Sequence, residues 1–115
     1  MRRGQVCWVD LHPRRGHEAG KRRPAIIVSN DGLNRVSARL GRGVVTVVPL
    51  TTATERVHPF QVLLEAGDGG LPVESKAQAE QVRSVDVQRI TGVLGVVCSA
   101  TMAAIDDALR LHLAL

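Results

Sequence analysis

Apolar and polar residues alternate along several short stretches of the chain, and this pattern predicts strands. Residues 5–11 alternate in a way that predicts a strand with two partly buried faces, and we expect Trp8 to belong to the core. The β-branched run at 44–50 is the clearest strand, and Pro49 predicts an edge or a bulge near its end. The same reasoning predicts shorter strands at 25–28, 60–65 and 90–97.

Polar stretches separate these strands. Residues 12–23 form a Gly- and Arg-rich stretch that is long for a hairpin loop, and long ordered loops tend to be functional. Residues 30–43 are expected to form a second polar loop, and residues 51–59 a third. The run at 67–70 is expected to be a turn rather than a phosphate-binding loop, because no helix follows it.

The C-terminal part of the chain predicts one amphipathic helix. Ser99 is a suitable N-cap, and Met102, Ile105 and Leu109 follow at helical spacing, so we expect a helix over about 100–113. Residues 75–85 are ambiguous, since their composition favours a helix although they lie between strand-like stretches. Several short strands and a terminal helix indicate a mainly β fold with α, in which the helix packs against a small, strongly bent barrel.

Length and composition limit the organisation. The 115 residues, 44% hydrophobic and 23% charged, are typical of one soluble domain over 1–115. No apolar stretch approaches a membrane span, and we expect neither a signal peptide nor a membrane partner. Cys7 and Cys98 lack metal-ligand spacing and are expected to be free thiols in a reducing cytoplasm.

Charge is distributed unevenly along the chain. Residues 1–42 carry ten Lys or Arg and three Asp or Glu, whereas the remainder carries five and eight. Thirteen of the fifteen cations are arginine, whose planar group suits bidentate phosphate contacts. This asymmetry indicates one surface that faces a polyanion.

The run 20–29 carries the most informative chemistry. Pro24 restricts Arg23, the residue before it, to extended backbone geometry. Arg23 is therefore expected at the entrance of a strand, where its guanidinium can bind a phosphate. Thr51 and Thr52 follow the strongest strand, and Glu18 lies in the loop before Arg23. A hydroxyl, a fixed guanidinium and a carboxylate form a plausible set for phosphodiester cleavage.

Other chemistries fit the residues less well. The four histidines do not fall at metal-ligand spacings, so no metal site and no cofactor are expected, and no GxSxG motif supports serine hydrolysis. Acid–base cleavage of RNA by His12 or His17 paired with His58 stays open.

Five ordered blocks resemble the MazF/PemK-type toxins of bacterial toxin–antitoxin systems. They are RGQVCWVDLHPRRGHEAGKRRPAIIVSND, VTVVPLTTAT, PFQVLL, AEQVRSVD and SATMAAIDDALRLHLAL. The resemblance implies an SH3-like (CcdB/MazF-like) barrel with a C-terminal helix, extended structure over 75–85, and a homodimer. It also implies a metal-independent, sequence-specific endoribonuclease that a cognate antitoxin silences.

The resemblance also assigns roles to individual residues. Arg23 and Thr51 match the family's catalytic pair, and Glu18 matches a glutamate that contributes in some members. Gln81 and Ser84 match residues that help contact RNA. His12 stands where many family members have a second acidic residue, and His17 stands where they have a small polar residue. These two differences affect the expected RNA base preference rather than the fold.

The expected substrate is single-stranded RNA, because its splayed bases are readable. Aromatic residues are scarce, so base stacking would fall to Arg14, Arg15 or His17. The expected RNA-binding residues are Arg14, Arg15, His17, Lys21, Arg22, Thr52, Gln81 and Ser84. The antitoxin is expected to lay an acidic disordered segment in the RNA groove. Two alternatives keep the fold: a CcdB-like gyrase-poisoning toxin and a non-catalytic SH3-like RNA-binding module.

Overall fold

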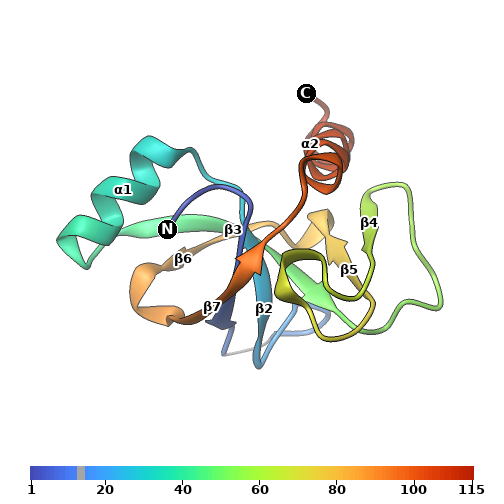
Figure 1. The fold of residues 1–115 in the computed structure, drawn as a ribbon, viewed down its shortest axis with the longest axis horizontal. Coiled ribbons are helices and arrows are strands. Elements are labelled where there is room, and N and C mark those ends of the chain that lie inside the picture. The colour runs from blue at the N-terminus through green and yellow to red at the C-terminus, as the bar shows by residue number, and fades with distance from the viewer. Residues whose placement is uncertain (13–14) are drawn as a thin grey trace.

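The computed structural model of the chain describes residues 1–12 and 15–115. Within that part, seven strands form one bent antiparallel sheet in the order β4-β5-β3-β2-β1-β7, and β6 pairs with β3 (Figure 1). The strands are β1 Gln5–Asp10, β2 Arg22–Ile27, β3 Val44–Thr51, β4 Gln61–Leu64, β5 Ser75–Gln78, β6 Arg83–Asp86 and β7 Ile90–Val96. The predicted barrel-like fold with a C-terminal helix is confirmed, although the sheet stays open.

The two faces of the sheet support two apolar clusters, as the alternating strands predict. The first contains Val6, Ile26 and Val48 and is covered by Ile105 of the C-terminal helix α2 (Ser99–Leu113). The second contains Cys7 and its neighbours on alternate positions of β1, β2 and β3. Burial raises the pKa of the Cys7 thiol, as expected for an apolar surrounding.

Pro49 lies inside the sheet, so the prediction of an edge was wrong. On one side β3 pairs with β2, and on the other it pairs with β6 up to Val47 and with β5 from Leu50 onward. Pro49 therefore occupies the interval in which β3 changes partner. A residue without an N–H is tolerated there because the ladder is already interrupted.

Residues 30–43 contain a helix, α1 (Asp31–Leu40), where the sequence predicted a loop. Asn30 caps it, because the side-chain oxygen accepts the Leu33 N–H at 2.8 Å. Gly41 ends it with a left-handed φ of 64°.

The buried face of α1 is polar, which explains why the apolar pattern did not reveal it. Asn34 is fully buried and donates to the Ser29 carbonyl at 2.9 Å, while the Ser29 hydroxyl donates to its side-chain oxygen. Ser37 donates to the Val44 carbonyl. The apolar residues of α1, namely Leu33, Val36 and Leu40, are exposed instead.

The ambiguous segment 75–85 is extended, as the family resemblance implied. Strands β5 and β6 account for most of it, and a single 3₁₀ turn, η2 (Ala79–Gln81), connects them. The helical propensity of this segment is therefore expressed only in that turn.

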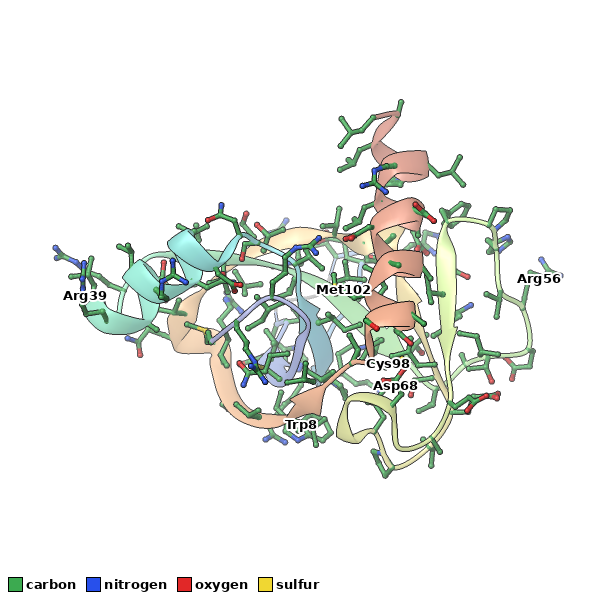
Figure 2. The ribbon with its side chains drawn as sticks, turned by 45° about the horizontal axis from the view of Figure 1, so that its top comes forward. Trp8, Arg39, Arg56, Asp68, Cys98 and Met102 are labelled. Atoms are coloured by element: carbon green, nitrogen blue, oxygen red, sulfur yellow. The ribbon has the colours of Figure 1, made fainter. Side chains whose placement is uncertain are left out.

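The start of α2 differs from the prediction. Its N-cap is Cys98 rather than Ser99, and the Cys98 side chain makes no capping bond. Asp68, from the 3₁₀ turn η1 (Asp68–Gly70), accepts the Cys98 N–H at 2.9 Å and the Thr101 hydroxyl. Figure 2 shows Asp68 beside Cys98 at the base of the helix.

Turn η1 can reach the helix because it packs directly on the backbone of β7. A Cβ atom at Gly70 would lie 2.3 Å from the Leu94 carbonyl oxygen, and Gly70 has a φ of 76°. Glycine is required at this position on both counts.

In the described part of the chain, neither helix combines the length and the apolar character that crossing a bilayer requires.

Candidate active site

Strand register brings Arg23 and Thr51 together. Strands β2 and β3 are antiparallel, and Ala25 lies opposite Pro49. Continuing this register by two residues places Arg23 opposite Thr51 on the same face of the sheet, because side chains alternate along each strand.

Both residues line one hollow of about 190 Å³, which we call the Arg23–Thr51 hollow. Its lining consists of Lys21, Arg22, Arg23, Pro24, Leu50, Thr51, Thr52 and Ser75. Three cations and two threonines therefore surround a space open to solvent, which suits an anionic group.

The loop that enters β2 is held in an unusual conformation at the rim of the hollow. Lys21 has a φ of 66°, in the left-handed region that side chains rarely adopt. Its carbonyl accepts the Leu11 N–H at 2.9 Å, which fixes the strained residue against the end of β1. Such conformations cost about 1–3 kcal/mol and cluster at functional sites.

The two arginines of β2 are oriented differently. Arg23 is half-buried, and its Nε–H donates to the Gly20 carbonyl at 2.9 Å. Arg22 is exposed, donates from Nε to the Thr91 hydroxyl at 3.0 Å, and stacks its guanidinium 4.6 Å from the Trp8 ring centre. Trp8 is consequently a half-buried support for Arg22, and the expectation that it belongs to the core was wrong.

The hydroxyl side of the hollow comes from β3 and β5. Thr51 is half-buried and its Oγ1 accepts the Ala53 N–H at 3.3 Å, whereas Thr52 is exposed. Ser75 is buried and donates to the Val73 carbonyl at 3.1 Å. The sequence did not reveal Ser75, because its proximity to Thr51 depends on the pairing of β5 with β3.

The loop before β2 carries other predicted residues outside the hollow. Arg15, His17 and Glu18 are exposed and are not among the described residues that line it. Arg14 lies outside the described residues.

Gln81 and Ser84 occupy different environments. The Gln81 side chain accepts the Ala19 N–H and donates to the His17 carbonyl, both at 3.0 Å. Ser84 is exposed and lies opposite Thr46. Ser84 is not among the described residues that line the hollow.

None of the three histidines considered for acid–base cleavage, His12, His17 and His58, is among the described residues that line the Arg23–Thr51 hollow. His58 stacks on Phe60 with ring centres 5.2 Å apart. Across residues 1–12 and 15–115, no three His, Cys, Asp or Glu side chains gather as a metal ion would need.

Residues 2–113 match the family described as PemK-like, MazF-like toxin of type II toxin–antitoxin system. The chain belongs to this family. It is similar to endoribonuclease MazF9 of Mycobacterium tuberculosis, with 54% identity over 98% of this chain and 96% of the relative. It is also 32% identical to endoribonuclease EndoA of Bacillus subtilis, over 100% of this chain and 96% of the relative.

Solved structures agree with this membership. An endoribonuclease in complex with its cognate antitoxin from a mycobacterial species has a TM-score of 0.79 and 31% identity, over 100% of this chain and 96% of that one. MazF from Deinococcus radiodurans has a TM-score of 0.83 and 28% identity, over 100% of this chain and 97% of that one. The predicted family is confirmed, and neither the gyrase-poison nor the non-catalytic alternative is favoured.

Proposed function

We propose that the chain is a toxin endoribonuclease that cleaves single-stranded RNA at the Arg23–Thr51 hollow. The observation that carries the proposal is that Arg23 and Thr51 line the same hollow at one end of the paired strands β2 and β3. The relatives that share this fold over nearly their whole length are named endoribonucleases, which supports the reaction class.

The proposed nucleophile is the substrate's own 2′-hydroxyl. Its oxygen forms a bond to phosphorus, and the bond from phosphorus to the 5′-oxygen breaks. A base takes the 2′-hydroxyl proton, and an acid returns a proton to the departing 5′-oxygen. The products are a 2′,3′-cyclic phosphate and a 5′-hydroxyl.

Arg23 stabilises the charge that builds on the non-bridging oxygens during this step. A guanidinium stays positive at every relevant pH, and its fork matches two phosphate oxygens, so it can neutralise the phosphorane without a metal ion. The same permanence makes arginine a poor base. We assign the base to Glu18, which is exposed and does not line the hollow itself but lies in the loop whose Gly20 carbonyl accepts the Arg23 Nε–H. We assign to Thr51 a hydrogen bond to a phosphate oxygen.

The surrounding cations suit the rest of the substrate. Lys21 and Arg22 line the hollow, and Arg15 is exposed in the same loop, so a phosphate backbone can follow this rim. Arg22 lies over the Trp8 ring and donates to the Thr91 hydroxyl, and these two contacts orient its charge.

The proposed assembly is a cytoplasmic homodimer regulated by an antitoxin. Strands β4 and β7 end the sheet, and exposed Val93 and Val96 of β7 would gain cover from a second copy. A related endoribonuclease has been solved with its cognate antitoxin. We propose that the antitoxin of this chain binds through an acidic segment that competes with RNA for the basic rim.

A substrate with one 2′-deoxy sugar tests the nucleophile. That sugar is placed on the 5′ side of the scissile phosphate in an otherwise identical labelled RNA. We expect the ordinary RNA to be cut in EDTA, with 5′-hydroxyl and cyclic or 3′-phosphate ends, and the deoxy RNA to stay intact. Equal cutting of both substrates, or loss of activity in EDTA, would refute the mechanism.

Light scattering and competition test the assembly. The purified chain at micromolar concentration should have twice the monomer mass, and saturating antitoxin should displace RNA. A stable monomer would refute the dimer, and undiminished RNA binding in the presence of antitoxin would refute the competition.

A further inference from the structure

We infer that Gln81 is a positioning residue, which fixes the loop carrying Glu18 against the Arg23–Thr51 hollow instead of contacting RNA itself. This inference rests on the proposed function, since it assigns the loop to the same site. It differs from the role that the family resemblance implied for Gln81.

Both ends of the Gln81 amide are used by the loop backbone. Oε1 accepts the Ala19 N–H at 3.0 Å, and Nε2 donates to the His17 carbonyl at 3.0 Å. The two contacts are on either side of Glu18 in the sequence. The amide therefore holds the peptide on each side of the carboxylate, as a backbone strand would.

The clamped residues are linked directly to the hollow. Ala19 is 7% exposed and packs in the second core cluster, so its N–H has no ready access to water if Gln81 is removed. The next residue, Gly20, accepts the Arg23 Nε–H at 2.9 Å. A loop that moves at Ala19 will therefore change the orientation of Arg23 as well as the place of Glu18.

The start of the same loop has a separate anchor. Arg89 donates from Nη1 to the carbonyls of Asp10 and His12. Gln81 comes from η2, and Arg89 from the 3₁₀ turn η3 (Val87–Arg89) just before β7. Two side chains from consecutive turns thus hold the loop at two points, and the one nearer to Glu18 and Arg23 is Gln81.

The two possible roles of Gln81 predict different kinetics. A side chain that contacts RNA contributes mainly to substrate binding, so its loss raises KM. A side chain that positions Glu18 and Arg23 acts on the chemical step, and a displacement of about 1 Å can lower the rate by about 10²-fold. The positioning role thus predicts a lower kcat with KM nearly unchanged.

The experiment compares three variants by amide hydrogen exchange without RNA and by steady-state cleavage. Gln81→Leu removes both hydrogen bonds at similar volume, whereas Gln81→Glu keeps the acceptor for Ala19 and loses the donor. The matched control is Gln88→Leu, because Gln88 also donates from Nε2 to a backbone carbonyl, that of Gly41 at 2.7 Å, beyond the end of α1.

We expect Gln81→Leu to speed exchange at the Ala19 amide and to lower kcat about 10- to 100-fold. Gln81→Glu should retain protection at Ala19 and recover part of kcat, and Gln88→Leu should change neither quantity. Unchanged exchange at Ala19, or a raised KM at wild-type kcat, overturns the inference. Exchange needs no activity, so a wild-type protein that leaves RNA intact refutes the proposed function, and exchange at the Ala19 amide still shows whether Gln81 anchors the loop.

Discussion

Replacing Arg23 with alanine should abolish most RNA cleavage while the fold persists. Arg23 lines the hollow with Thr51, and the register of β2 and β3, continued two residues beyond the Ala25–Pro49 pair, places it opposite Thr51. Loss of one preorganised electrostatic donor typically lowers kcat by about 10²–10³, or about 2.7–4 kcal/mol of transition-state stabilisation.

The structural cost of the same change should be smaller. The substitution removes the hydrogen bond to Gly20, worth about 1 kcal/mol, and a half-buried aliphatic stem. For a domain of this size, each loss of about 1 kcal/mol corresponds to a fall in Tm of about 4 °C. Single-turnover cleavage of labelled RNA and thermal unfolding by circular dichroism measure the two effects separately.

The matched control is Arg39→Ala. Arg39 lies in the last turn of α1, where Figure 2 shows it at the tip of the helix, and it is not among the described residues that line the Arg23–Thr51 hollow. The control loses the same charge, so a fall confined to Arg23→Ala identifies the site rather than general attraction. If Arg23→Ala cleaves at close to the wild-type rate, or if both variants lose activity equally, the assignment is wrong.

The remaining predictions concern the hydroxyl of Thr51 and the carboxylates of Asp68 and Asp31. Thr51→Ala should lower the cleavage rate with little change in Tm, because the hydrogen bond that Thr51 Oγ1 accepts from the Ala53 N–H is long, at 3.3 Å; a collapsed Tm would make Thr51 structural. Asp68→Ala should lower the free energy of unfolding in urea by about 1–2 kcal/mol, since Asp68 caps α2. The hydrogen bond from the Arg3 backbone N–H lowers the pKa of Asp31 in the folded protein. The ionised carboxylate therefore stabilises the fold at pH values above the pKa of Asp31 in the unfolded chain. This stabilisation is lost as the pH falls through the pKa of Asp31 in the folded protein. Asp31→Asn should reduce the acid sensitivity of urea unfolding, and an unchanged pH profile would contradict this.

The strands and the terminal helix could be predicted because their signals are local. Alternation marks β1, a β-branched run marks β3, and helical spacing of apolar residues marks α2, whichever segments they later contact. Helix α1 could not be found in the same way, because it buries Asn34 and Ser37 and exposes its leucines. Pro49 lies inside the sheet because β3 changes its pairing partner there, from β6 to β5. The residues next to Pro49 in the sequence do not indicate where this change occurs.

The site could be predicted only in part, for a similar reason. Arg23 and Thr51 are marked by their own neighbours, a proline and a strand end, so the sequence indicates them. Ser75 enters the hollow through the pairing of two strands, and the contacts of Gln81 join residues more than sixty positions apart. Long-range pairing of this kind leaves no trace in residue spacing.

The capping of α2 by Asp68 has a consequence for the order of folding. The carboxylate that satisfies the first turn of α2 lies thirty positions earlier in the chain than the Cys98 N–H that it accepts. An isolated helix of about 15 residues is marginal in water even with favourable local caps. The last helix therefore completes its first turn only after β7 and turn η1 have come together, and a peptide spanning 98–115 should be largely unstructured. Turn and helix should then open together as a single cooperative unit.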